Sequence, residues 1–468
     1  NLTAFESYLK GLEQQAIFSY GSLAVAESHF KQALARDPAF TDARMALARN
    51  YLLKNGTGLI TDEQAREQIE PLIRQAREQD PDSRLARAFE LMIKMGVNSS
   101  NIEALEHKSI LEELRGLLAL VPTETYIRMR VAGRLSGFLD DKQAGIEVLQ
   151  AGLLIDTLAA DLHGQMGEIY LADQRIDEAR EEIERAQQLA PDNPNHYNLL
   201  SELEKENNNL PAALDWTRRA IEVDPQDHEL AAVLAQDLYA LELPEEGDRW
   251  YARVKALAPD SPVTRRVELN QAMARKDYAQ AKRLAGAMIS EQVGNRQGSF
   301  FVAVIIYADL MFKAGTEKEG YDFFVSVRPE ITNYEVLPSD FKGRLMQWIS
   351  IGLMTGFESF EFRKQAWLKH AAALDARGVP WRQPERAATT WDNIMKGDID
   401  SAAEHYLEHR LSQPMASNLN MHKRGFEPFL REVFADPRVA ARLAKKDTEF
   451  AQLRRTVSEL MLEPEWTQ

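Results

Sequence analysis

The chain contains no cysteine among its 468 residues. That absence excludes disulfides, thiol nucleophiles and cysteine-ligated zinc sites, but it fits reducing and oxidising compartments equally well. Basic side chains are outnumbered by acidic ones, 56 to 72, which leaves a net charge of −16. A nucleic-acid binder needs a basic surface to neutralise phosphates, so we expect no nucleic-acid partner.

Long apolar runs are also missing. The most apolar stretch, residues 300–308, ends at Asp309, whereas a membrane-spanning helix needs about 20 such residues. We therefore expect no membrane insertion of this fragment. The chain starts at Asn1 rather than at a methionine, with no basic and apolar leader before its body, so we expect a mature or truncated product.

One spacing of small and bulky residues recurs along the chain. A small residue is followed four positions later by a bulky one, three further on by a small one, and after five more by proline. The clearest copies are Ala179, Ile183, Ala186, Pro191, then Ala213, Thr217, Ala220, Pro225, then Gly247, Tyr251, Val254, Pro259. These three copies are 34 residues apart. The spacing also appears as Ala26, Phe30, Ala33, Pro38, and weaker copies begin at Ile69, Ile110, Ala144 and Ala402, which makes eight in all.

This spacing predicts a pair of packed helices in every repeat. Steps of three and four place the recurring residues on one helical face, and the proline ends the second helix. A single pair of helices cannot bury its apolar face, so neighbouring pairs must stack on one another. The sequence therefore predicts an all-α protein.

The pattern of Gly167, Tyr170, Ala179, Ile183, Ala186 and Pro191, with its 34-residue period, resembles the tetratricopeptide repeat. Two features depart from that family. Tryptophan is absent from the first helix of every copy, and the family's glycine is mostly replaced by alanine or serine. The resemblance implies a solenoid of helical hairpins wound into a right-handed superhelix. The stretches where the period is lost add an irregular helical segment and a C-terminal capping helix.

The period divides the chain into four predicted regions. Residues 1–293 hold tetratricopeptide-like repeats, strictest over 125–261, and residues 383–416 form a further unit of this type. Residues 294–382 are an irregular, aromatic-rich helical segment. Residues 417–468 contain an amphipathic capping helix that begins at Asp436-Pro437-Arg438 and runs to Leu462.

The aromatic-rich segment allows two interpretations. Residues 300–391 hold 16 of the 39 aromatic side chains, which either fill a thicker core or line a pocket or partner groove. The aromatic residues in question are Phe301, Phe312, Phe323, Phe324, Trp348 and Trp367, together with the aliphatic Ile305, and Trp381 and Trp391 are further candidates for a pocket.

The resemblance also implies a binding surface, the concave face built from the first helix of each repeat. Amide side chains there suit recognition of a peptide backbone, because they carry both a donor and an acceptor. The candidate binding residues are Asn195, Asn198, Glu202, Lys205, Gln236, Tyr239, Arg266 and Asn270. The same helices place Asp161, Gly164, Glu168, Leu171, Glu229, Ala232, Val263 and Met273 on this face.

The charge of this face indicates the kind of partner. The Lys, Asn and Arg clamp that the family uses for acidic chaperone tails is missing, and Glu168 and Glu202 lie in that neighbourhood. We therefore expect a protein or peptide ligand that is neutral or basic.

One string has the spacing of an enzyme motif. His405-Tyr406-Leu407-Glu408-His409 matches H-x-x-E-H, in which two histidines bind zinc and the glutamate activates water. Only 59 residues follow His409, too few for the third ligand at the distance that the motif implies, and cysteine is not available. Tyr406 and His409 also fall on the packing face of a repeat. We therefore expect neither a metal site nor catalysis, and no cofactor.

These observations favour a non-catalytic scaffold that binds a protein or peptide. The ends of the chain, with Tyr8-Leu9-Lys10-Gly11, Asp37-Pro38 and Phe434-Ala435-Asp436, are similar to tetratricopeptide regions of membrane-tethered bacterial regulators. That resemblance implies the sensing or docking region of a larger bacterial envelope or regulatory protein, in the periplasm, with the cytoplasm as the alternative. Two other hypotheses stay open: a small-molecule or enzymatic site in residues 294–416, and a structural assembly factor.

Overall fold

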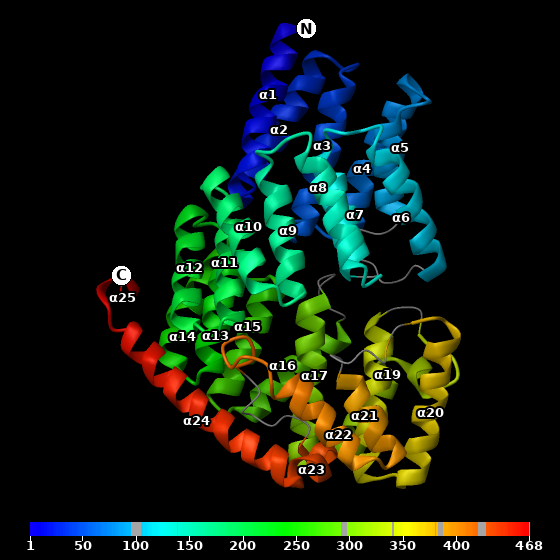
Figure 1. The fold of residues 1–468 in the computed structure, drawn as a ribbon, viewed down its shortest axis with the longest axis vertical. Helices are drawn as coiled ribbons and strands as arrows, with labels where there is room; N and C mark the ends of the chain where they lie inside the picture. The colour runs from blue at the N-terminus through cyan, green and yellow to red at the C-terminus, as the bar shows by residue number, and fades with distance from the viewer. Residues whose placement is uncertain are drawn as a thin grey trace. The chain divides into compact units, whose positions relative to one another are not determined.

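The protein is all-α over the part of the chain that the computed structural model describes, residues 1–94, 104–137, 139–291, 297–338, 341–379, 381, 387–419 and 427–467. Helices follow one another through these ranges with no strand between them (Figure 1). The predicted fold class is confirmed. None of the described helices is both long and apolar enough to cross a membrane.

The chain folds as two compact units. The first consists of Asn1–Glu204 with Ala212–Leu230, and the second of Lys205–Pro211 with Ala231–Gln468. This division lies inside the stretch 125–261, where the period is strictest. The predicted boundaries at residues 293, 382 and 416 follow the loss of the sequence period instead.

The first unit is built from successive helical hairpins. They are α1 (Leu2–Ile17) with α2 (Tyr20–Arg36), α3 (Thr41–Gly56) with α4 (Asp62–Gln79), α5 (Arg84–Lys94) with α6 (Ala104–Leu118), α7 (Thr125–Gly137) with α8 (Lys142–Leu153), α9 (Ala160–Ala172) with α10 (Ile176–Leu189), and α11 (Pro194–Glu206) with α12 (Leu210–Val223). The next helix, α13 (His228–Ala240), contains the boundary between the units.

The second unit continues with hairpins of the same kind. They are α13 with α14 (Pro244–Leu257), α15 (Pro262–Ala274) with α16 (Tyr278–Ser290), α17 (Gln297–Ala314) with α18 (Glu317–Val327), α19 (Phe341–Leu353) with α20 (Phe360–Ala376), and α21 (Ala387–Lys396) with α22 (Ile399–His405). Short turns of other helix types are η1 (Pro329–Thr332), η2 (Met354–Gly356) and the π-helix η3 (Tyr406–Arg410). The segment predicted to be irregular therefore contains two further hairpins, α17–α18 and α19–α20.

The recurring small and bulky residues pack the two helices of a hairpin together. Ala179, Ile183 and Ala186 on α10 are fully buried. A side chain at Gly167 on α9 would overlap Ile183, so a residue without a side chain lets the two helices approach closely. In the hairpin α13–α14, Gly247 leaves the same kind of space for the ring of Tyr239.

The turns inside these hairpins share one backbone feature. Six non-glycine residues of the described chain have a φ between 56° and 59°. Five of them lie at the end of the first helix of a hairpin or in the turn that follows it, and successive members of the five are 34 positions apart. Left-handed backbone at one fixed position lets the chain reverse direction in the same way in each hairpin. These residues are Asp140, Gln174, Asn208, Glu242 and Lys276.

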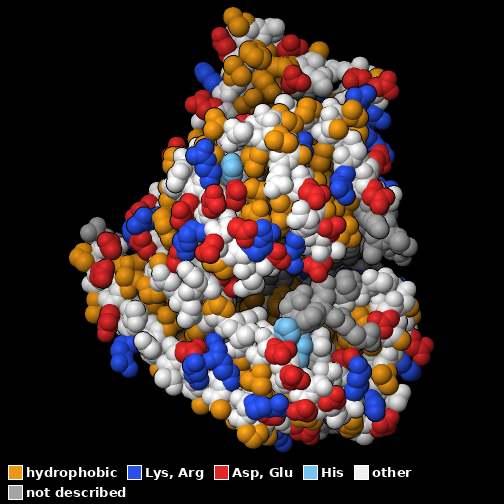
Figure 2. Space-filling model, viewed as in Figure 1, with side chains coloured by type: hydrophobic (Ala, Val, Ile, Leu, Met, Phe, Trp, Pro, Cys, Tyr) orange, Lys and Arg blue, Asp and Glu red, His pale blue; other side chains and the backbone are white. Residues whose placement is uncertain are grey.

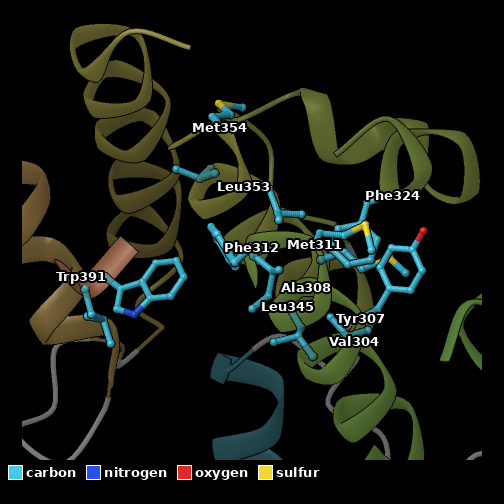
Figure 3. Packing of buried hydrophobic residues seen from close by; sticks show 14 of the residues in the cluster. Val304, Tyr307, Ala308, Met311, Phe312, Phe324, Leu345, Leu353, Met354 and Trp391 are labelled. Atoms are coloured by element: carbon cyan, nitrogen blue, oxygen red, sulfur yellow. The ribbon is translucent and has the colours of Figure 1, made fainter. Parts of the chain in front are cut away.

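The second unit has a core of large side chains (Figure 3). Phe312 of α17, Phe324 of α18 and Trp391 of α21 lie in one hydrophobic cluster and are at most 3% exposed. Gly352 of α19 makes room for Trp391, because an added Cβ would come within 2.6 Å of the indole ring. The core of the first unit consists mostly of Ala, Leu and Ile side chains from α2 to α11.

The C-terminal helices follow the hairpins as α23 (Glu427–Ala435), α24 (Pro437–Leu460) and α25 (Pro464–Thr467). The predicted start is confirmed: Asp436 caps α24 and accepts a hydrogen bond from the Arg438 amide at 2.8 Å. The helix ends at Leu460, two residues before the predicted end. Its buried residues include Val439, Leu443, Phe450 and Val457.

Basic side chains of α24 form hydrogen bonds with the rest of the second unit. Lys446 is only 2% exposed and donates to the carbonyl oxygen of Gln413 at 2.7 Å. Arg442 donates to the carbonyl of Leu411 at 3.2 Å, directly after η3. Further along, Arg454 bonds Glu242 in the α13–α14 turn at 3.2 Å. The capping helix therefore lies along this unit from η3 to α14.

Candidate functional site

In the first unit, the candidate binding residues lie on the neighbouring helices α9 and α11. Asn195 and Glu202 of α11 are exposed and Asn198 is half-buried. Asp161 and Glu168 of α9 are also exposed. Two adjacent first helices therefore present amide and carboxylate groups to the same solvent-accessible side, which we call the α9–α11 surface.

A buried layer supports the α9–α11 surface. Gly164 is buried because His196 of α11 lies against it, 3.3 Å from where a Cβ would be. Burial lowers the pKa of His196 to about 4, so this imidazole is neutral near pH 7. Asn193 is also buried; its side-chain oxygen accepts from the Asn195 amide at 3.0 Å, which fixes the start of α11.

Asn198 has the most open hydrogen-bonding capacity of this set. Its side-chain amide makes no hydrogen bond within the described part of the chain, and it lies one helical turn from Asn195 and from Glu202. Leu171, the fourth α9 residue predicted for the face, is half-buried. The surface can therefore offer an amide donor and acceptor beside carboxylates.

The candidate residues of the second unit are arranged differently. Gln236 donates to the carbonyl oxygen of Ala232 at 2.8 Å, and Asn270 donates to that of Arg266 at 3.0 Å. These amides bond the carbonyl one turn earlier on their own helix and have less capacity for a ligand. Arg266, Glu229 and Met273 are half-buried, whereas Ala232 and Val263 are buried.

The structure corrects the expectation for two residues. Lys205 is 8% exposed, and its ammonium lies 3.0 Å from the Asp237 carboxylate. Tyr239 is 1% exposed, packs on Gly247 and donates its hydroxyl to Asp248 at 2.7 Å. Neither side chain faces an open surface. The register of the repeat gave no signal of this burial. Tyr239 fills the space that Gly247 leaves on the facing helix, and a spacing pattern does not show which side chain fills such a space.

The two histidines of the H-x-x-E-H string lie side by side, His405 at the end of α22 and His409 within η3. The ring centroids of His405 and His409 are 4.6 Å apart, and the Nδ1 of His405 is 2.7 Å from the Thr390 hydroxyl. No group of three or more metal-ligating side chains lies together in the described ranges of the chain. Within those ranges, His405 and His409 therefore lack the third protein ligand that a catalytic zinc site needs.

Most of the aromatic side chains of residues 300–391 belong to the core. Trp367 is fully buried and its indole nitrogen donates to Asp392 at 2.8 Å. Trp381 packs edge-on against Trp367, and Trp348 stacks 4.5 Å from Trp391. Phe323 and Trp348 are partly buried against the same cluster, and Ile305 is half-buried. Phe301 differs, with 37% exposure. The interpretation as a thicker core is confirmed for Phe312, Phe324 and Trp367.

A groove that the sequence reasoning missed lies between α4 and α5 in the first unit. Its volume is about 590 Å³. The lining residues are Arg66, Glu70, Ile73, Arg74 and Arg77 of α4, and Glu90, Ile93 and Lys94 of α5. The available signal was the basic residues at helical spacing along α4, which a search for the repeat passes over.

Charged side chains of both signs are spread over the visible face of the molecule (Figure 2). Apolar side chains gather at the N-terminal end, where Leu2, Phe5 and Leu9 of α1 are 73%, 47% and 48% exposed. The α8–α9 turn exposes another apolar group, Leu154, Ile155 and Leu158.

The left-handed residue at every thirty-fourth position, together with glycine at the close approach of two helices, identifies the type of repeat. These are tetratricopeptide-type hairpins. The recognition made from Gly167 to Pro191 is thus confirmed as a fold. No protein-family model and no curated protein sequence matches the chain.

Several solved structures are similar to this chain. A tetratricopeptide repeat protein from Parabacteroides merdae has 15% identity, covers 59% of this chain and 98% of its own, and has a TM-score of 0.37. Yeast Tom70 has 12% identity over 91% of this chain and 89% of its own, with a TM-score of 0.41. The Cut9–Hcn1 structure has 12% identity over 95% and 76%, with a TM-score of 0.45.

Proposed function

We propose that this protein is a non-catalytic scaffold that binds a neutral or basic peptide segment on the α9–α11 surface. The observation that carries the proposal is the pair of adjacent first helices with exposed Asp161, Glu168, Asn195 and Glu202 around the unbonded amide of Asn198. An amide can pair with a peptide backbone through both its donor and its acceptor. The carboxylates favour a partner that carries no excess of negative charge.

The rigid support below the surface also favours a binding role. A neutral, buried His196 and a hydrogen-bonded Asn193 hold α9 and α11 in place, so little conformational entropy would be lost when a ligand binds. We further propose that the chain acts as the docking region of a larger bacterial envelope or regulatory protein. The support for that role is the resemblance of its ends to such regions.

The test is a peptide-display selection against the protein, followed by affinity measurements on the recovered peptides. We expect Asn198→Ala and Asn195→Ala each to weaken binding by about tenfold, the loss of roughly one hydrogen bond of 1–1.5 kcal/mol. Gln188→Ala is the matched control, because Gln188 is an exposed amide on the second helix α10.

Three results would refute the proposal. One is a selection that yields only acidic peptides. Another is an equal loss of affinity in Asn198→Ala and Gln188→Ala. The third is a peptide that binds with unchanged affinity to the double variant Asn195→Ala with Asn198→Ala.

A further inference from the structure

The groove between α4 and α5 has the size of a ligand site. Its volume of about 590 Å³ lies within the range of roughly 300–1,000 Å³ that is usual for small-ligand sites. One face of α4 provides Arg66, Glu70, Arg74 and Arg77 at steps of three and four, and the end of α5 provides Lys94. All lining residues belong to the first unit.

The charge of this groove is opposite to that of the whole chain. Four cationic and two anionic side chains line it, so 4 − 2 gives a local charge of +2 in a protein of net charge −16. Glu90 is already engaged, with Arg77 at 3.4 Å and Arg87 at 3.3 Å. Glu70 therefore remains as the only lining carboxylate without an ion pair, among the residues that the structure describes.

Two of the arginines are available to a ligand. Within the described part of the chain, Arg66 and Arg74 take part in no ion pair and no hydrogen bond. Both are exposed, and they lie two helical turns apart on α4 with Glu70 between them. A guanidinium binds a carboxylate through two parallel hydrogen bonds, so two such groups can hold two separate carboxylates.

Two apolar residues line the groove together with the charged groups. Ile73 of α4 and Ile93 of α5 line the groove and are 4% and 9% exposed. A ligand that reaches them must carry an apolar group between its acidic groups. Nucleic acid fits this arrangement poorly, because four cations neutralise few phosphates and the −16 charge of the protein repels a long polyanion.

We infer that the α4–α5 groove binds an acidic peptide segment in which two carboxylates flank an apolar side chain. The carboxylates pair with Arg66 and Arg74, and the apolar side chain covers Ile73 and Ile93. This site is separate from the α9–α11 surface and takes a partner of opposite charge. Its test therefore fails or succeeds independently of the proposed function.

The experiment measures fluorescence anisotropy with a capped, fluorescein-labelled peptide of alternating glutamate and leucine. We expect the full chain to bind it with a Kd below about 1 mM at low salt, and Arg66→Gln with Arg74→Gln to weaken binding at least about tenfold. The matched control, Lys10→Gln with Arg185→Gln, removes the same charge from exposed positions outside the groove and should bind like the wild type.

A gain-of-function variant makes the test independent of any loss of folding. Glu70→Gln removes the carboxylate between the two arginines, so it should tighten the acidic peptide by about two- to tenfold. It should leave the α9–α11 ligands unchanged. An alternating lysine and leucine peptide should bind the groove of no variant.

Four outcomes would overturn the inference. The acidic peptide fails to bind the wild type, or the groove and control variants lose affinity equally. Glu70→Gln leaves its affinity unchanged or weakens it. Finally, a single-stranded oligothymidine binds more tightly than the peptide and depends on Arg66 and Arg74, which would assign the groove to nucleic acid.

Discussion

The strict repeats of residues 125–261 and the aromatic-rich hairpins of residues 297–376 reach the same local fold with different cores. In the strict repeats, Gly167 and Ala179 let two helices approach closely around Ile183. In the aromatic-rich hairpins, the space is filled by rings such as Phe324 and Trp367. A helical hairpin thus requires complementary faces, and either small or large side chains can provide them.

The turns of the two regions also differ, in the residues that adopt left-handed backbone. From Asp140 to Lys276, the left-handed position is occupied by five polar residues with side chains, at a constant interval. After Lys276, the left-handed residues of the described chain are glycines at unequal intervals: Gly315 and Gly397 in the α17–α18 and α21–α22 turns, and Gly378 after α20. A constant interval needs constant helix and turn lengths, so the period disappears from the sequence as soon as those lengths vary, although the hairpins persist.

The largest expected effect tests the aromatic core. Trp367→Ala should destabilise the protein by about 3–5 kcal/mol, because it empties a fully buried site and removes the indole donor from Asp392. Urea unfolding followed by circular dichroism measures it. Phe301→Ala is the control in the same region and should cost less than about 1 kcal/mol, since Phe301 is 37% exposed. Equal losses would contradict the distinction between core and surface rings.

A second prediction asks whether the two regions respond alike to acid. His370 of α20 is buried and bonds Gln347 at 2.9 Å. Burial lowers its pKa to about 4, as does the nearby positive charge of Arg344. The unfolded state, with a pKa near 6.5, binds a proton that the folded state does not, so stability is full above about pH 6.5 and falls as the pH drops toward 4.

The free energy of unfolding at pH 5 should therefore be about 2 kcal/mol lower than at pH 7.5. His370→Gln should abolish that part of the pH dependence. His196, whose pKa is also about 4, makes the same prediction for the strict repeats. Urea unfolding of both variants at the two pH values checks it. A variant with the same pH dependence as the wild type would show that the imidazole in question is not held neutral.

The smallest expected effect concerns the turns. Gln174 is exposed and has a φ of 59°, a conformation that glycine adopts more readily. Left-handed backbone costs a non-glycine residue about 1–2 kcal/mol, and the extra freedom of glycine in the unfolded chain offsets about half of that gain. Gln174→Gly should therefore stabilise the protein by about 0.5–1 kcal/mol. Gly378→Ala, at a φ of 62° with open space around it, should destabilise it by a similar amount.

Thermal unfolding measures both turn variants. Asn208→Gly should gain less than Gln174→Gly or lose stability, because asparagine already tolerates left-handed backbone and its side-chain oxygen accepts a hydrogen bond from the Ala416 amide at 3.1 Å. If Gln174→Gly destabilises the protein, contacts of that side chain, and not the backbone, control the turn.

Much of the fold could be predicted from residue spacing. The pattern from Ala179 to Pro191 predicted the hairpins, and Asp436-Pro437 predicted the start of α24, since capping and proline geometry are local properties of the chain. The hairpins α17–α18 and α19–α20 were predicted only as irregular helix. Their packing depends on ring contacts such as that of Trp391 with Gly352, which no fixed spacing encodes.

The candidate sites could be predicted less completely from the sequence. Asn195, Asn198 and Glu202 can be placed on one helical face from their spacing, and the structure leaves them on an accessible surface. Lys205 and Tyr239 follow the same register but are buried, because Asp237 and Gly247 provide partners from elsewhere in the fold. The α4–α5 groove needs Ile93 and Lys94 brought beside Arg74, which only chain folding does.

The sequence by itself determined that this protein is all-α, that its helices pair, and that it has no cysteine chemistry and an excess of negative charge. These follow from short-range spacing and composition. The tertiary structure alone decided which polar residues stay exposed, where the chain divides into two units, and how a basic groove arises in an acidic protein. Each of these depends on contacts between residues far apart along the chain, whose partners no local pattern specifies.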